Sequence, residues 1–132
     1  MSKYNAKRTK IDDIKFDSQA EGLYYEHLKG LEKAKVISYF VCHPKYLLQP
    51  KFEKNGVKYR EISYIADFEV TYSDGRIEVI DVKPTFLLEA FKLKRKLFEY
   101  KYPQLEIKCV TYTKKYGWET HEENRERKKG KK

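Results

Sequence analysis

Two aspartates and a lysine have the types and spacing needed to cleave a phosphodiester bond. Asp81 and Lys83 are two residues apart in the segment RIEVIDVK, which is rich in β-branched residues and predicts a strand. Successive side chains of a strand point to opposite faces, so Asp81 and Lys83 project from the same face. Asp67 belongs to the preceding predicted strand, within YIADFEVTY. The turn at residues 73–75 decides whether Asp67 joins that face.

The turn chemistry favours a register in which Asp67 lies opposite Asp81. A two-residue turn at Asp74-Gly75 would put Asp67 opposite Val82. A three-residue turn with Gly75 in the left-handed conformation puts Asp67 directly opposite Asp81, with their Cβ atoms about 5 Å apart. We expect this second register, because it also gathers apolar residues on the other face of the hairpin. These residues are Ala66, Phe68, Val70, Ile80 and Val82.

Two carboxylates held this close repel each other unless a cation lies between them. Mg²⁺ is the natural candidate, because it prefers oxygen ligands and binds through one or two carboxylates, with water and substrate phosphate completing its shell. We expect Mn²⁺ to substitute for it. Lys83 would stabilise the charge on an attacked phosphate or help to activate a water. The group therefore predicts metal-assisted phosphodiester hydrolysis.

A helix and a sheet must position these residues. A first helix is predicted from Ser18 to about residue 34, because Ser18 and Glu21 have the spacing of a capping box and apolar residues follow at helical intervals. Strands are predicted between residues 36 and 83, a second helix at 85–100, and a last strand in LEIKCVTY. This order predicts an α/β fold with a mixed central sheet flanked by helices.

The second predicted helix places one lysine on its apolar side. At about 100° per residue, Phe86, Ala90, Leu93 and Leu97 form an inward arc that Leu87, Phe91 and Phe98 widen. Lys92, Arg95 and Lys96 lie on the opposite side. Lys94 falls within the arc, where an unpaired charge is costly. We expect Lys94 to meet the acidic cluster, which makes it a further catalytic candidate.

The composition predicts one basic domain that binds nucleic acid. The chain has 132 residues, which suits a single core, and 29 Lys and Arg against 20 Asp and Glu give a formal net charge of +9. We predict a basic N-terminal arm at 1–16, a nuclease domain at 17–118 and a charged, disordered tail at 119–132. The expected phosphate contacts are Lys7, Arg8, Lys10, Lys92, Arg95 and Lys96.

Cysteine usage and hydropathy indicate the compartment. Two cysteines are too few for a disulfide scaffold, and reduced thiols are the rule in a cytosol. No segment approaches the roughly 18 apolar residues of a membrane span. We therefore expect a cytoplasmic protein that does not enter a membrane.

The residues resemble the PD-(D/E)xK nuclease superfamily. The order of Glu21, Asp67 and the string Asp81-Val82-Lys83 carries this resemblance. The strings FDSQAEG, YIADFEV, IDVKP and KLKRKLFEYKYP are similar to a phage-borne branch of that superfamily, and the chain resembles phage Holliday-junction-resolving endonucleases. The resemblance covers about residues 4–112. It implies a restriction-endonuclease-like αβββαβ core.

The resemblance also implies roles for individual residues. Asp67 and Asp81 would be metal ligands, Glu21 a further acidic ligand or a contact to metal-bound water, and Lys83 the catalytic lysine. The Val82 carbonyl would help to hold the ion. Alanine at position 66 replaces the proline of the superfamily's name, and aspartate at position 81 replaces the commoner glutamate.

The expected function is that of a Mg²⁺-dependent DNA endonuclease, a phage Holliday junction resolvase that acts on branched or four-way DNA. Resolution of a junction needs two cuts, which implies a symmetric homodimer. A nicking or restriction-like nuclease and a transposase-type endonuclease are alternatives within the enzyme class. A non-catalytic nucleic-acid-binding module is the alternative outside it, and Ser18 with Glu21 would then be only a helix cap.

Overall fold

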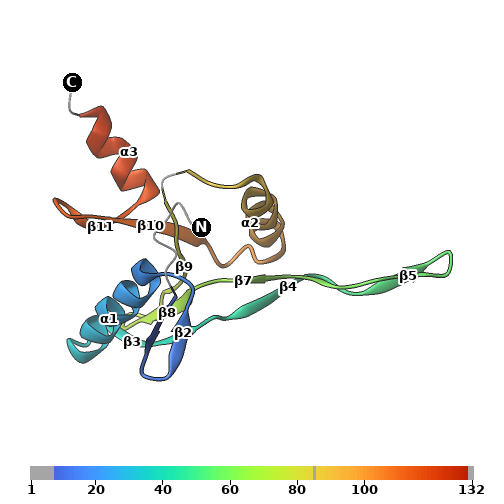
Figure 1. The fold of residues 1–132 in the computed structure, drawn as a ribbon, viewed down its shortest axis with the longest axis horizontal. Helices are drawn as coiled ribbons and strands as arrows, with labels where there is room; N and C mark the ends of the chain where they lie inside the picture. Colours follow the sequence, from blue (N-terminus) through green and yellow to red (C-terminus); the bar gives the residue numbers. More distant parts are fainter. Residues whose placement is uncertain (1–7, 85, 131–132) are drawn as a thin grey trace.

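The computed structural model describes residues 8–84 and 86–130. Its elements are β1 (Thr9–Ile11), β2 (Ile14–Phe16), α1 (Gln19–Lys33), β3 (Ile37–Cys42), β4 (Lys45–Gln49), β5 (Phe52–Lys54), β6 (Val57–Tyr59), β7 (Ile62–Ile65), β8 (Phe68–Tyr72), β9 (Ile77–Val82), α2 (Glu89–Lys101), β10 (Ile107–Thr113), β11 (Gly117–Thr120) and α3 (His121–Lys129). A five-stranded mixed sheet has the order β11-β10-β9-β8-β3, with β9 and β10 parallel (Figure 1). The fold is mixed α/β, as the sequence predicts. Within the described ranges no helix is long and apolar enough to cross a membrane.

The β8–β9 hairpin has the predicted register. Phe68 pairs with Ile80 and Thr71 with Ile77, which puts Asp67 opposite Asp81. The turn has three residues between Tyr72 and Arg76, and Gly75 has a φ of 95°. A left-handed residue at the third turn position is the geometry in which glycine has no steric cost. The local turn chemistry therefore fixes the relative position of the two aspartates.

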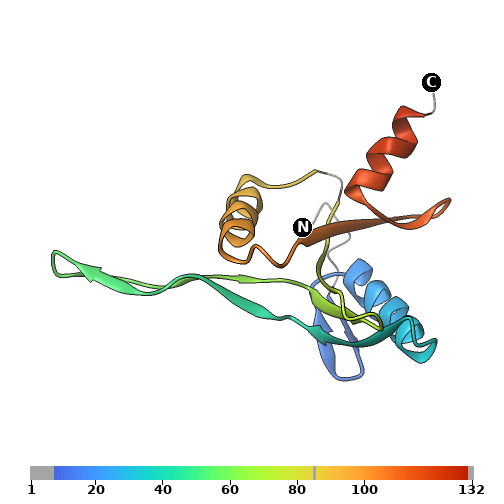
Figure 2. The same ribbon diagram turned by 180° about the vertical axis from the view of Figure 1, so that it is seen from behind.

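The helices α1 and α2 build two apolar clusters. The cluster at α1 includes Phe16, Tyr24, Leu28, Phe68, Val70 and Ile80. The cluster at α2 includes Tyr46, Tyr64, Ala66, Val79, Phe98 and Ile107. Figures 1 and 2 show the two helices in different parts of the molecule, with β8 and β9 between them.

The predicted apolar face of the hairpin is wrong at Ala66. Ala66 packs in the α2 cluster, whereas Phe68 and Val70 pack in the α1 cluster. The chain bends between them: the His43 N–H donates to the Asp67 carbonyl at 2.9 Å, and His43 has a φ of 55°. Asp67 lies in this bend, between β7 and β8. Because of this bend at Asp67, Ala66 and Phe68 face different clusters although they are two residues apart.

Part of the predicted N-terminal arm is folded. Residues 1–7 lie outside the described part of the chain, but β1 and β2 pair as an antiparallel hairpin. Phe16 is fully buried, and the hairpin packs so closely on α1 that a Cβ at Gly22 would lie 2.8 Å from Thr9 Cγ2. The prediction of a loosely ordered arm is thus wrong for residues 9–16, where Ile11, Ile14 and Phe16 supply an apolar face.

The predicted disordered tail is also corrected, because residues 117–129 form β11 and α3. Thr120 caps α3 by accepting from the Glu123 N–H at 3.0 Å, and Glu123 accepts from the Thr120 N–H at 2.8 Å. Glu119 binds Arg127 at 2.8 Å and Asn124 at 2.9 Å. Complementary charges and a capping box order α3, while Trp118 of β11 packs on the apolar cluster at α1.

Helix α2 presents a different face to the core from the predicted one. Phe98 is buried and Phe91 half-buried, and Arg95 lies on the same side, where it donates to the Ile107 carbonyl at 3.2 Å. Leu93 is 60% exposed and Leu97 is 38% exposed. Apolar residues occur around most of this helix, so their spacing alone did not fix which side faces inward.

Candidate active site

Asp67 and Asp81 hold each other's strands through backbone hydrogen bonds. The Asp67 N–H donates to Asp81 Oδ1 at 2.9 Å, and the Val82 N–H donates to Asp67 Oδ2 at 2.8 Å. Each carboxylate therefore satisfies a backbone donor at the end of the hairpin, where the ladder stops. The arrangement fixes both side chains by the fold itself rather than by flexible surface contacts.

Asp81 is buried on the α2 side of the sheet. It is only 2% exposed, and its Oδ2 accepts a hydrogen bond from the Tyr64 hydroxyl. Burial raises the pKa of Asp81 to about 6, against the opposing charges of Lys83 and Arg95. Sequence reasoning missed Tyr64, because nothing in a chain with twelve tyrosines distinguishes the one whose hydroxyl reaches this carboxylate.

Glu21 and Asp67 interact on the α1 side. Burial, and after it the charge of Asp67, raise the pKa of Glu21 to about 7, while the Asp17 N–H donates weakly to Glu21 Oε1 at 3.4 Å. Burial also raises the pKa of Asp67, opposed by the Val82 N–H and by Lys83. The Glu21 N–H donates to Ser18 Oγ at 3.1 Å, so the predicted helix cap and the predicted acidic site share one residue.

Lys83 is the cation whose charge acts on all three acids. Its charge lowers the pKa values of Glu21, Asp67 and Asp81. Its Nζ lies 4.8 Å from the centre of the Phe91 ring, a cation–π distance. The Lys83 carbonyl lies 3.2 Å from His121 Nε2, so the first residue of α3 contacts the backbone of the lysine. Helix α2 and helix α3 thus both position Lys83.

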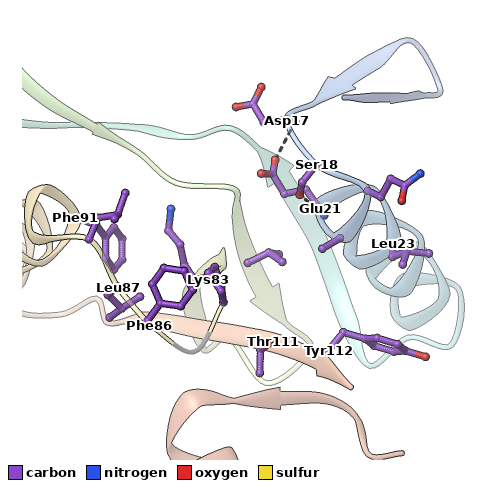
Figure 3. Close-up of a pocket in the computed structure, with 15 residues that line it drawn as sticks. Asp17, Ser18, Glu21, Leu23, Lys83, Phe86, Leu87, Phe91, Thr111 and Tyr112 are labelled. Carbon is purple, nitrogen blue, oxygen red and sulfur yellow. Dashed lines mark hydrogen bonds between the residues drawn. The ribbon is translucent and has the colours of Figure 1, made fainter. Parts of the chain in front are cut away.

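A cavity of about 520 Å³ opens beside Lys83 (Figure 3). Its polar side comes from Asp17 and Ser18, which precede α1, from Glu21 in the first turn of α1, and from Lys83, which follows β9. Its apolar side is lined by Leu23, Phe86, Leu87, Leu88, Phe91 and Tyr112. The free N–H groups and dipole of a helix N-terminus favour an anion. One wall of the cavity therefore combines the carboxylates of Asp17 and Glu21 with a helix N-terminus and Lys83, and the other wall is apolar.

Lys94 is not part of this group. It is exposed and lies with Glu61, Ile62 and Leu93 in a shallow groove between α2 and β7. The cation that α2 directs toward Asp81 is Arg95, so the predicted catalytic candidate is wrong by one position. The reason is the orientation of α2, which points Phe91 and Arg95 inward and Leu93 outward.

The predicted phosphate contacts differ in their exposure to solvent. Arg8, Lys10, Lys92 and Lys96 are exposed, as surface contacts require. Arg95 is half-buried against Cys109 and the Ile107 carbonyl, which corrects its assignment as a phosphate contact. Lys7 lies outside the described residues.

The acids fit a hard divalent ion held by few protein ligands. In residues 8–84 and 86–130, no three His, Cys, Asp or Glu side chains gather closely enough to bind one metal. Glu21 and Asp67 remain a partly buried, mutually repelling pair with raised pKa values, which a cation would relieve. Mg²⁺ needs only one or two carboxylates when water and phosphate supply the rest. Asp81 accepts hydrogen bonds from the Asp67 N–H and the Tyr64 hydroxyl, so it orients Asp67, and its expected role as a metal ligand stays a prediction.

Comparison with known proteins places the chain in a family. No curated protein matches it. Residues 1–118 match a family described as "Protein of unknown function (DUF1064)", so that the match ends before α3. Since the match spans most of the chain, the protein belongs to the DUF1064 family.

Proposed function

We propose that this protein is a Mg²⁺-dependent DNA endonuclease with a restriction-endonuclease-like core. The elements α1, β3, β8, β9, α2 and β10 follow one another as αβββαβ once the paired strands β4–β7 are set aside as an insertion. The parallel pair β9–β10 is joined by α2, as such a core requires. The chain order and the sheet order are both consistent with the core that the sequence resemblance implies.

One observation carries the proposal. Asp67 and Asp81 are interlocked by two backbone hydrogen bonds directly beside Lys83, and Glu21 reaches the same place from α1. Three acids with raised pKa values around one lysine are typical of functional sites rather than of ordinary surfaces. A non-catalytic module would have no need to gather three acids that are buried or partly buried, since removing a carboxylate's charge from water is costly.

Each of these residues would have its own role in phosphodiester hydrolysis. Glu21 and Asp67 would hold the metal, with the Val82 carbonyl as a further oxygen, and Asp81 would keep Asp67 in place. The bound Mg²⁺ would supply charge neutralisation and a more acidic water. Lys83 would stabilise the negative charge that develops on the phosphate, and the first turn of α1 would help to hold that phosphate in the cavity. Mn²⁺ would support the same chemistry.

Branched or four-way DNA is the proposed substrate, and the host cytoplasm the proposed compartment of a phage enzyme. Two symmetric cuts require a homodimer. An apolar strip on α2 and β7 would serve as its contact, because it stays exposed in one chain: Leu93, Leu97 and Ile62 are its members. The three side chains line one groove together with Ala90, so they form a contiguous apolar surface of the kind that interaction sites use.

Two other functions remain as alternatives. A nicking, restriction-like or transposase-type endonuclease would use the same acids on ordinary duplex. A nucleic-acid-binding module would bind DNA without cleaving it.

Cleavage of a labelled four-way junction, beside a duplex of the same sequence, separates these functions. We expect symmetric cuts in the junction alone, in Mg²⁺ but not in EDTA, for the wild type and the exposed control Glu106→Gln. Equal cleavage of both substrates would contradict junction specificity and keep the nuclease. Binding without cleavage in Mg²⁺ or Mn²⁺ would contradict the nuclease.

A further inference from the structure

A two-stranded ribbon projects from the body of the protein between β4 and β7. It comprises residues 50–60, with β5 and β6, and is called here the projecting ribbon. Phe52 pairs with Tyr59 and Lys54 with Val57. Figures 1 and 2 show the ribbon extending far from the helices, and every one of its residues is exposed. An isolated two-stranded hairpin is only marginally stable in water, so this length of ribbon is not explained by packing within the chain.

The tip of the ribbon is narrow. Asn55 and Gly56 have φ values of 52° and 78°, the signature of a two-residue turn whose twist matches the strands. Adjacent strands lie about 4.8 Å apart. A ribbon of this width fits the major groove of B-DNA, which is about 12 Å wide and admits a two-stranded β-ribbon.

The ribbon is strongly basic. It carries Lys51, Lys54, Lys58 and Arg60 and one acid, Glu53. None of these four cations has an ion-pair partner among the described residues, in contrast to Lys45, which binds Glu61 at 3.3 Å just below the ribbon. Four unpaired cations on a narrow projection are electrostatically suited to phosphates on either side of a groove.

An aromatic pair stiffens the ribbon and faces solvent. The rings of Phe52 and Tyr59 are stacked, with centroids 4.7 Å apart and an interplanar angle of 12°. Each side chain is still more than two-fifths exposed. The cross-strand pair therefore stabilises the register and leaves flat apolar surface between the cations.

We propose that the projecting ribbon is a second DNA-binding element that enters a groove of the duplex next to the cleavage site. The inference rests on the proposed function in taking DNA as the substrate. The cations would contact phosphates, and the Phe52–Tyr59 pair would pack on sugars or bases. A second copy of the chain is a poorer occupant, because two ribbons of the same net positive charge repel each other.

Salt-dependent binding of a fluorescent four-way junction tests the ribbon, with EDTA present to prevent cleavage. The variants are Lys54→Gln/Lys58→Gln near the tip and Lys51→Gln/Arg60→Gln near the base, none of which alters the turn or the aromatic pair. The matched control is Lys33→Gln/Lys114→Gln, which removes two exposed lysines from α1 and from the turn between β10 and β11. Circular dichroism checks that each variant folds.

Each ribbon double variant should bind roughly tenfold more weakly at 0.15 M salt, and the slope of log K against log[salt] should fall by about 0.9 per lost phosphate contact. The control should bind like the wild type. Cleavage in Mg²⁺ at saturating enzyme should persist in all four proteins, because the acids are intact. If both ribbon variants bind DNA with the wild-type affinity and the wild-type salt dependence, while the protein still cleaves DNA, the proposed DNA binding by the ribbon is wrong and the proposed nuclease function is unaffected. If light scattering shows that the ribbon variants lose a dimer of the wild type while their DNA affinity is unchanged, the proposal is wrong and the ribbon binds a second copy of the chain.

Discussion

Asp81→Asn isolates the energetic effect of one buried carboxylate. Burial raises the pKa of Asp81 from 3.8 to about 6, so the folded chain favours the protonated acid. The stabilising effect of that preference is complete below pH 3.8 and is lost as the pH rises through about 6. Asparagine cannot ionise, so the variant does not lose this stabilisation as the pH rises. At about 1.4 kcal/mol per pH unit, the free energy of unfolding of the variant should gain up to about 3 kcal/mol on the wild type between pH 4 and pH 8.

Urea unfolding in EDTA at these two pH values measures the gain. Asparagine also changes a hydrogen bond to Asp67 or Tyr64, but that effect is the same at both pH values and cancels in the comparison. His27 and His121, whose pKa values are lowered by burial, destabilise the fold as the pH falls, and they are present in both proteins. With a urea slope of roughly 1–3 kcal/mol/M, the difference between the midpoints should change by about 1–3 M.

The control for this measurement is Glu106→Gln, which alters an exposed acid just before β10. Its midpoint should differ from the wild type by the same amount at pH 4 and at pH 8. A pH-independent difference for Asp81→Asn as well, or a wild type whose stability rises relative to the variant as the pH rises, would refute the raised pKa of Asp81.

Three further outcomes are expected. Tyr64→Phe removes the hydroxyl that donates to Asp81 but keeps the packed ring, so junction cleavage should slow about tenfold, as for loss of one positioning hydrogen bond, and need more Mg²⁺; an unchanged Mg²⁺ dependence in a kinetic titration would contradict that role. Glu119→Ala removes the partner of the α3 arginine, so hydrogen exchange of α3 should quicken relative to α1, and equal protection in both proteins would contradict it. Leu93→Lys/Leu97→Lys should yield monomers by light scattering, and a retained dimer mass would contradict the α2 contact.

The parts of the fold that local chemistry decides could be predicted from the sequence. The three-residue turn that ends at Gly75 and the apolar alternation together specified the register of β8 and β9, because a one-residue slip would turn every side chain to the other face. Ser18 specified the start of α1, because its hydroxyl caps the Glu21 N–H. Both features depend on residues that are close in sequence.

The parts that depend on tertiary packing could not be predicted in this way. Leu93 and Phe91 have similar hydropathy, and only the cluster around Phe98 and Ile107 determines that Phe91 and Arg95 face inward. The bend at Asp67 depends on a distant residue, His43. The charged tail reads as disorder by composition, yet its acids and bases pair with one another. Function-bearing contacts such as Tyr64 with Asp81 arise from the same non-local packing.

Single-turnover cleavage of a four-way junction in Mg²⁺ tests the central claim most directly. The proteins to compare are the wild type, Asp67→Asn, Lys83→Met and the control Glu106→Gln, with junction binding measured in EDTA for each. We predict that Asp67→Asn and Lys83→Met bind the junction and lose cleavage by at least about a hundredfold, which corresponds to about 2.7 kcal/mol of transition-state stabilisation. The control should cleave like the wild type. Cleavage at the wild-type rate by either site variant would contradict the assignment of the active site.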